Sequence, residues 1–279
     1  MSVDGGPTIV FWGVRGSHPT PGPDRLYGGD TSCVELLSAD GQRLILDAGT
    51  GIIRLGQRWE SSKEPLPINI LLTHFHWDHI QGLPFFQPLY QPQASVAIWS
   101  PLPEAKTRKR LAAQMSPPFF AVSYESLPAR PQCLTLQGVQ DIGDFRVSRF
   151  PLCHPSEAWG YRIDFDGCSV VYATDHEWGE PATDDVMIAE ASEADLLIGD
   201  AHFTPAELEA HQGWGHSSWR QMTELARRAG VDQLILFHHA PGRSDAELEA
   251  ILEEARAEFP NTQLARQDAV VRLSRQPRL

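Results

Sequence analysis

Apolar runs of strand length recur along the chain and alternate with segments of helical composition. This alternation predicts sheets covered by helices, which is an α/β fold built in layers. One helix is marked by "HSSWRQMTELARRAG", in which Ser217 or Ser218 can form the N-cap and Gly230 ends the helix. A second is marked by "SDAELEAILEEARAEFP", in which Ser244 and Glu247 fit a capping box. The predicted strands are residues 8–13, 43–49, 68–73, 95–99, 168–174, 195–199 and 233–238.

A dense group of polar side chains, "THFHWDH" at residues 73–79, directly follows one of these apolar runs. His74 and His76 alternate like strand residues, which would place both imidazoles on one side of the chain. Asp78 and His79 lie where the chain must turn into its next element. Because imidazole and carboxylate groups suit zinc, the pattern favours a paired metal site over a polar turn with hydrogen-bonded histidines.

Further candidate ligands lie where other predicted strands end. "RFPLCHP" contains His154, "SVVYATD" ends in Asp175, and "QLILFHH" ends in His238 and His239. Strand ends converge on one rim of a sheet, so side chains distant in sequence can share a site there. Taken singly, each residue fits an ordinary structural role as a loop histidine, a turn or helix-cap aspartate, or a surface histidine. Taken together beside H-x-H-x-D-H, they predict a single metal centre.

Chain length and charge restrict the classes of protein that remain. At 279 residues with 42% hydrophobic composition, the chain can bury one large core or at most two closely fused halves, and we predict a single domain over residues 1–279. The 36 acidic residues outnumber the 23 Lys and Arg, and the net charge of −13 argues against broad capture of nucleic acid, although local basic patches are compatible with it. No signal sequence and no apolar run near the ~20 residues of a membrane span is present, so a cytoplasmic protein without membrane contact is expected.

The cysteines give no sign of a disulfide framework. They are scattered and lack C-x-x-C spacing, which predicts reduced and mostly packed thiols. The four are Cys33, Cys133, Cys153 and Cys168.

The polar motif and the strand-end residues resemble the metal-ligand set of the metallo-β-lactamase superfamily, whose fold is a four-layer αβ/βα sandwich. The resemblance extends over nearly the whole chain. The segments "FWGVRGSHPTPGPDRLYGGDTSCVEL", "LILDAGTG" and "GWGHSSW…AGVDQLILFHHAP" are similar to the phosphodiesterase branch of metal-dependent hydrolases. That branch includes tRNase Z and the cyclic phosphodiesterase of bacterial phosphonate breakdown.

The resemblance implies a centre for two divalent metal ions, zinc first, with manganese or iron as alternatives. One residue would bridge the two ions, and the others would divide into two sets. His238 is preferred to His239 as the last ligand because it directly continues the predicted strand, but the doublet leaves a one-residue ambiguity. The implied first set is His74, His76 and His154, the implied second set is Asp78, His79 and His238, and the implied bridging ligand is Asp175.

The resemblance also implies the reaction. A hydroxide held between two ions would attack phosphorus, and Asp78 and His216 would be the catalytic residues, with His216 in "GHSS" donating a proton to the departing alkoxide. Asp47 in "LILDAG" would accept a hydrogen bond from a ligand and orient it. The alternatives are a turn residue for Asp47 and a loop histidine for His216.

Departures from the family pattern bear on the substrate. Asp30 in "GGDTS" replaces a common Asn, and Ser156 and Glu157 in "HPSE" replace a common Gly pair, which predicts an acidic rim at the mouth of the site. With no long basic arm of the tRNase Z kind, the sequence favours a small phosphodiester, such as a cyclic nucleotide, over extended nucleic acid. The alternatives are a lactone, thioester or β-lactam hydrolase, a tRNA 3′-processing endonuclease, and a non-catalytic metal-stabilised module. Resemblance to this branch also suggests a homodimer.

Overall fold

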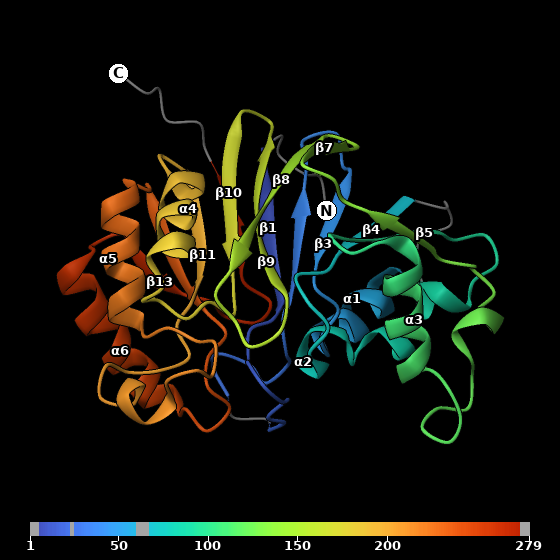
Figure 1. Cartoon of the computed structure of the whole chain (residues 1–279), viewed down its shortest axis with the longest axis horizontal. Helices are drawn as coiled ribbons and strands as arrows, with labels where there is room; N and C mark the ends of the chain where they lie inside the picture. Colours follow the sequence, from blue (N-terminus) through green and yellow to red (C-terminus); the bar gives the residue numbers. More distant parts are fainter. Residues whose placement is uncertain (1–5, 23–24, 60–66, 274–279) are drawn as a thin grey trace.

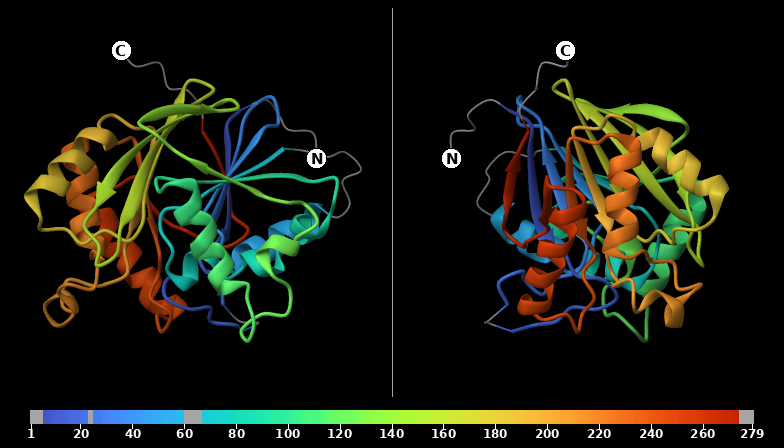
Figure 2. Two further views of the ribbon diagram at one scale, coloured as in Figure 1. Left: turned by 45° about the vertical axis from the view of Figure 1, so that its right-hand side comes forward. Right: turned by 90° about the vertical axis from the view of Figure 1, so that its left-hand side faces the viewer.

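Two β-sheets face each other and carry helices on their outer faces (Figure 1). The computed structural model describes residues 6–22, 25–59 and 67–273, and within these residues each sheet has seven strands. Figure 2 shows that the orange and red helices lie on one outer side and the blue and green helices on the other. The predicted four-layer αβ/βα sandwich is therefore confirmed.

The first sheet is formed mainly by the N-terminal half of the chain, and its last strand comes from the C-terminal end of the described residues. Its strands are β1 (Thr8–Gly13), β2 (Cys33–Leu37), β3 (Arg43–Leu46), β4 (Pro67–Leu71), β5 (Ser95–Ser100), β6 (Gln132–Thr135) and β14 (Val270–Arg272), in the order β14-β1-β2-β3-β4-β5-β6. Its helices are α1 (Gly51–Trp59), α2 (Trp77–Ile80) and α3 (Glu104–Gln114), with short 3₁₀ turns η1 (Leu83–Phe85), η2 (Gln87–Tyr90) and η3 (Tyr124–Ser126).

The second sheet is continuous in sequence and ends in parallel strands. Its strands are β7 (Val139–Ile142), β8 (Phe145–Leu152), β9 (Ala158–Phe165), β10 (Cys168–Ala173), β11 (Leu196–Asp200), β12 (Gln233–Phe237) and β13 (Thr262–Leu264), in the order β13-β12-β11-β10-β9-β8-β7. Its helices are α4 (Pro181–Ala191), α5 (Trp219–Ala229) and α6 (Asp245–Glu258), with the 3₁₀ turn η4 (Leu208–His211).

The space between the sheets is filled by apolar side chains from both of them. Leu36 and Leu44 of the first sheet and Val170 and Ile198 of the second are fully buried in one cluster. Separate apolar clusters lie under the helices of each outer face. β10 is buried at every position because it is covered on both faces, which is typical of a central strand in a layered α/β fold.

The helix ends follow the sequence signals. Ser218, rather than Ser217, is the N-cap of α5, and it accepts a hydrogen bond from the backbone N–H of Gln221. Gly230 ends this helix with φ 65°, a left-handed conformation that glycine adopts without a Cβ clash. At α6 the predicted capping box of Ser244 and Glu247 is present.

The seven predicted strands coincide with β1, β3, β4, β5, β10, β11 and β12. One boundary differs in a way that matters for the site. β4 ends at Leu71, so His74 and His76 lie on the loop before α2 rather than in strand alternation, whereas Asp78 and His79 lie within α2. The two imidazoles nevertheless come together, with ring centroids 4.6 Å apart.

Strand direction gathers the predicted ligands at one edge. β10, β11 and β12 are parallel, and β8 runs the same way as β10 because β9 is antiparallel to both. The residues that follow β8, β10 and β12 therefore emerge at the same edge of the second sheet. That edge lies beside α2 of the first sheet, at the lower centre of Figure 1.

Two general expectations can be compared with the described residues. Among them, no helix is long and apolar enough to cross a membrane. The cysteines are free thiols, as predicted, and Cys153 is the most exposed of them.

Candidate metal centre

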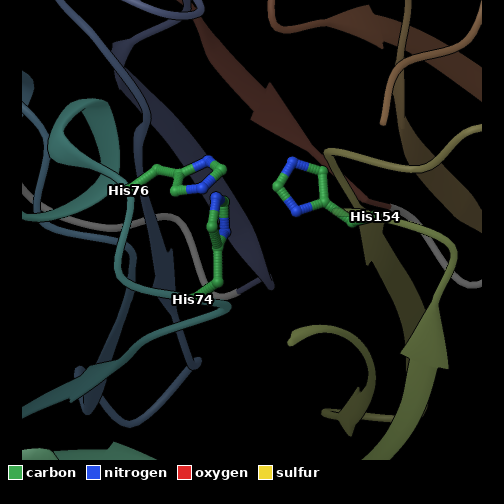
Figure 3. Close-up of side chains that lie close together, drawn as sticks. All are labelled: His74, His76 and His154. Carbon is green, nitrogen blue, oxygen red and sulfur yellow. The ribbon is translucent and has the colours of Figure 1, made fainter. Parts of the chain in front are cut away.

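Three histidines from two separate elements form the first group of candidate ligands. His74 and His76 come from the loop after β4, and His154 follows β8; Figure 3 shows their rings converging. One ring nitrogen from each lies within 4.8 Å of the others. The Nε2 atom of His74 is buried and has no hydrogen-bond partner. Burial of such an atom is costly unless it meets a ligand, so the group fits a metal ion.

The protonation of these histidines also suits metal binding. Burial lowers the pKa of His74 well below its ordinary value, and the neighbouring His79 lowers it further. Burial likewise lowers the pKa of His154 to about 4. Both imidazoles are therefore neutral near pH 7 and offer lone pairs, as a transition-metal ligand must.

A second group lies next to the first and contains two carboxylates. Asp78, His79, Asp175 and His238 are all buried, and each offers one atom within 4.8 Å of the others. Nε2 of His79 lies 3.3 Å from Nε2 of His238, and the latter lies 3.1 Å from Oδ2 of Asp78. Convergence of imidazole and carboxylate donors on one point is typical of a second metal position.

Asp175 lies between the two groups, where the bridging ligand is predicted. Its Oδ1 atom is 3.8 Å from Nε2 of both His74 and His154. Its Oδ2 atom is 3.1 Å from Nε2 of His79 and 3.4 Å from Nε2 of His238. One carboxylate oxygen therefore faces each group, although the ligand roles themselves remain predictions.

The buried carboxylates of the centre carry negative charge that a bound cation would balance. Burial alone raises the pKa of the Asp78 and Asp175 carboxyls, but the neighbouring histidines lower both below the ordinary range. Burial lowers the pKa of His79, yet the carboxylates of Asp175, Asp78 and Asp47 together raise it well above its ordinary value. The protein thus gathers buried anions that hold a proton on an imidazole, and divalent cations would replace that proton. The donor set fits the implied pair of metal ions.

Asp47 behaves as the predicted acceptor behind a ligand. Its Oδ2 atom accepts hydrogen bonds from Nδ1 of His79 at 2.8 Å and from the Tyr172 hydroxyl at 3.0 Å. Its Oδ1 atom accepts one from the backbone N–H of Thr73 at 2.8 Å. Because Nδ1 of His79 is held by this hydrogen bond, its Nε2 atom faces the other members of the second group.

Strained backbone supports the same side chains. Asp47, Asp175 and His238 have φ values of 61°, 57° and 60°, in the left-handed region that non-glycine residues rarely adopt. All three follow a strand that ends one or two residues earlier. Such strain clusters at functional sites, because the surrounding structure must hold each side chain in a required direction.

The loop after β1 packs against two members of the second group. The Ser17 backbone N–H donates a hydrogen bond to Oδ2 of Asp78 at 2.7 Å. A Cβ atom on Gly16 would lie 2.5 Å from Nδ1 of His238, so this position has no room for a side chain. The "GVRGS" segment therefore fixes one carboxylate and one imidazole of the centre.

His216 lies at the edge of the centre and is oriented by an aspartate. Its Nδ1 atom donates to Oδ2 of Asp200 at 2.8 Å and lies 3.8 Å from Oδ1 of Asp175. Burial lowers the pKa of His216, but the charge and hydrogen bond of Asp200 raise it to about 9. The imidazole is therefore cationic near pH 7 and can donate a proton.

The histidine doublet resolves into two different environments. His238 belongs to the second group, as described above. His239 points elsewhere, and its Nε2 atom donates to the Ala265 carbonyl at 2.9 Å. Burial lowers the pKa of His239 to about 3. The geometry therefore favours His238 over His239 as the predicted ligand.

Two residues of the site, Asp200 and His202, were missed in the sequence. His202 stacks on His216, with ring centroids 4.5 Å apart, and its Nδ1 atom donates to the His238 carbonyl at 3.0 Å. Both missed residues come at the end of β11, whose predicted span stopped one residue before Asp200. The strand-end rule that identified Asp175 and His238 would have found "GDAH" had that strand been extended.

The carboxylate of Glu157, expected to make the rim of the site acidic, is paired with two cations. Its Oε2 atom accepts hydrogen bonds from Nζ of Lys106 at 3.0 Å and Nη2 of Arg110 at 3.3 Å, so two cations of α3 balance its charge. Ser156 instead contacts a predicted ligand, because its hydroxyl lies 3.1 Å from Nδ1 of His154.

Asp30 is likewise occupied in holding the backbone around it. Its Oδ1 atom accepts from the Thr50 hydroxyl at 2.9 Å, and its Oδ2 atom accepts from Nε2 of Gln267 at 2.7 Å. The carboxylate ties the loop before β2 to the start of α1 and to the C-terminal segment. These hydrogen bonds give Asp30 a structural role.

Comparison with known proteins agrees with this architecture. The chain is 25% identical over 247 residues to ribonuclease BN of Cronobacter sakazakii, which covers 70% of this chain and 78% of that protein. The crystal structure of the metallo-β-lactamase fold protein YhfI from Bacillus subtilis superposes with a TM-score of 0.73 at 20% identity, covering 95% of this chain and 99% of that one. A diphosphatase of the PhnP family has a TM-score of 0.70 at 19% identity, covering 96% and 98%.

A family model decides the classification. The model described as the β-lactamase superfamily domain matches residues 42–239, which is more than half of the chain and includes every predicted metal ligand. The expectation of a metal-dependent hydrolase is thereby confirmed at the level of the family. The chain belongs to the β-lactamase superfamily.

Proposed function

We propose that the chain is a metal-dependent phosphodiesterase that hydrolyses a small phosphodiester, with cyclic nucleotides as the first candidates. The observation that carries the proposal is the Asp200–His216 pair, whose hydrogen bond of 2.8 Å directs an imidazole toward the edge of both candidate ligand groups. A metal store would not need an oriented acid there. Hydrolysis of a phosphodiester with a poor leaving group does need one.

His74, His76 and His154 would hold one divalent ion, Asp78, His79 and His238 would hold the other, and Asp175 would lie between them. Zinc suits this donor set best, and manganese or iron are the alternatives. When bound, such ions lower the pKa of water from ~15.7 toward ~7 and neutralise charge on phosphoryl oxygens.

The protein's own groups would then position and protonate the substrate. Asp78 is fixed by the Ser17 N–H and by His238, so its carboxylate can hold a hydrogen bond or an ion in one direction. His216 would donate its proton to the oxygen that leaves phosphorus. Asp200 would make Nε2 of His216 the nitrogen that donates this proton, because its carboxylate holds Nδ1.

Two observations bear on the size of the substrate. The net charge of −13 disfavours a long polyanion, although Glu157 adds little to this effect because Lys106 and Arg110 balance its charge. Similarity to ribonuclease BN makes RNA the second candidate. Both candidates share the same bond chemistry, so a substrate comparison distinguishes them.

The test is a panel of substrates given to one metal-loaded preparation. The panel contains a cyclic nucleotide, bis(4-nitrophenyl) phosphate, a precursor tRNA, a lactone, a thioester and a β-lactam. We expect kcat/KM to be highest for a small phosphodiester, with protein carrying Asp175→Ala, purified in parallel, as the control for contaminating hydrolases. Equal or faster turnover of the lactone would refute the proposal.

Asp200→Asn tests the orienting role of the carboxylate. Asp200 raises the pKa of His216, so its replacement by a neutral amide should lower that pKa. The acid form of His216 exists below its pKa and is lost as pH rises through it. The alkaline limb of the kcat profile should therefore move to lower pH, and kcat near pH 8 should fall by roughly 10-fold to 100-fold. An unshifted pH profile would show that Asp200 does not control the pKa of His216.

A further inference from the structure

An exposed tryptophan lies two residues before the candidate acid. Trp214 is 60% exposed, although aromatic rings of this size gain much of their stabilising free energy when they are buried. A single exposed apolar side chain is common on a protein surface, so the position of this one carries the argument. The position of this one, on the segment that leads into His216, makes it a candidate for contact with substrate.

A row of aromatic rings links Trp214 to the centre. Its ring meets His211 edge to face, with centroids 4.8 Å apart at 86°. His211 stacks on Phe203 at 4.5 Å and 24°, and Phe203 meets His216 at 5.9 Å and 74°. The exposed indole is thus the outer member of a packed row that begins at the acid.

The backbone on both sides of Trp214 is also fixed. The N–H groups of Gly213 and Gly215 both donate to the carboxylate of Glu177, at 2.7 Å and 2.8 Å. Gly215 has φ 86°, and a Cβ atom there would lie 2.2 Å from Cδ2 of His154. The backbone that carries the tryptophan is therefore packed against a predicted metal ligand, and its position relative to the site is fixed.

We infer that Trp214 is a stacking platform for a planar group of the substrate, namely the base of a nucleotide phosphodiester. This inference rests on the proposed function, because the phosphoryl group is taken to lie at the metal centre. An indole face accepts any base, since every base has a π-face, and it leaves the anionic phosphate to the metal ions. The platform therefore supplies affinity for the base and takes no part in bond cleavage.

The test measures binding separately from hydrolysis. Metal-loaded wild type, Trp214→Ala and Trp214→Phe are titrated by calorimetry with adenosine 5′-monophosphate and with ribose 5-phosphate, which lacks a base. Trp214→Ala should weaken binding of adenosine 5′-monophosphate by about tenfold and leave ribose 5-phosphate unchanged. Trp214→Phe should restore most of the affinity because it keeps a ring.

The matched control is Phe119→Ala, which removes another exposed aromatic ring, 78% exposed on the loop after α3, and should change neither affinity. For a cyclic nucleotide, Trp214→Ala should raise KM by the same factor and leave kcat within about twofold.

Three results would overturn the inference that Trp214 stacks on a base. They are equal affinity of wild type and Trp214→Ala for adenosine 5′-monophosphate, equal weakening of binding for both ligands, and no nucleotide binding by wild type. Failure of the proposed function would show differently. Base-dependent binding would persist, while wild type would hydrolyse no phosphodiester.

Discussion

Asp175→Ala is expected to remove at least one metal ion per chain and to lower turnover by about 10⁴-fold or more. The physical reason is the position of the carboxylate, which reaches Nε2 atoms of His74 and His154 at 3.8 Å and of His79 at 3.1 Å. Without it, the first group consists of histidines alone and the second keeps only the carboxylate of Asp78, so at least one divalent ion should be lost and its activation of water with it. Elemental analysis and steady-state rates on the same preparation measure both effects.

Asp184→Ala is the matched control for this variant. Asp184 is also buried and also accepts a hydrogen bond from a histidine, Nε2 of His176 at 3.0 Å, but it lies outside both ligand groups. It should lose stability while keeping its metal ions. If Asp175→Ala binds as much metal as wild type and turns over at a similar rate, the two-ion arrangement is wrong.

His216→Ala is expected to keep the metal ions and the fold but to lose roughly 10²–10⁴-fold in kcat, the usual contribution of a positioned general acid. The imidazole is a neighbour of Asp175, at 3.8 Å, and is not one of the seven predicted ligands, so metal content should be unchanged. The measurement is kcat on an alkyl phosphodiester and on bis(4-nitrophenyl) phosphate, with elemental analysis of each sample.

The two substrates separate the roles that His216 can have. A nitrophenolate needs little protonation as it leaves, so the loss should be small for that substrate and large for the alkyl one. Equal losses would indicate charge stabilisation or substrate placement instead of proton donation. Unchanged rates on both would exclude His216 from the reaction.

Much of the fold could be predicted because local signals and tertiary structure agree. The caps at Ser218 and Ser244 and the glycine at Gly230 are local devices whose geometry does not depend on the rest of the chain. The convergence of the candidate ligands was predictable for a similar reason. His74 to His79 are adjacent in sequence, and the remaining candidates follow apolar strands whose ends meet at one edge.

The parts that could not be predicted depend on side chains brought together only by folding. The charge of Glu157 is balanced by Lys106 and Arg110 of α3, which is distant in sequence. The residues next to Glu157 in the sequence therefore do not indicate this pairing. His74 and His76 converge through a loop turn instead of strand alternation, because β4 ends at Leu71. The role of Asp200 emerges only once β11 is seen to end beside His216.

The most direct measurement for the central claim is an anomalous-difference map from crystals of metal-loaded protein, recorded at the absorption edge of the bound metal. Two peaks about 3.5–4 Å apart are expected. One should lie among His74, His76 and His154 and the other among Asp78, His79 and His238, with Asp175 between them. The contradicting result is no peak at these positions, or a single peak among His202, His216 and His238, the other described group of histidines that can converge on an ion.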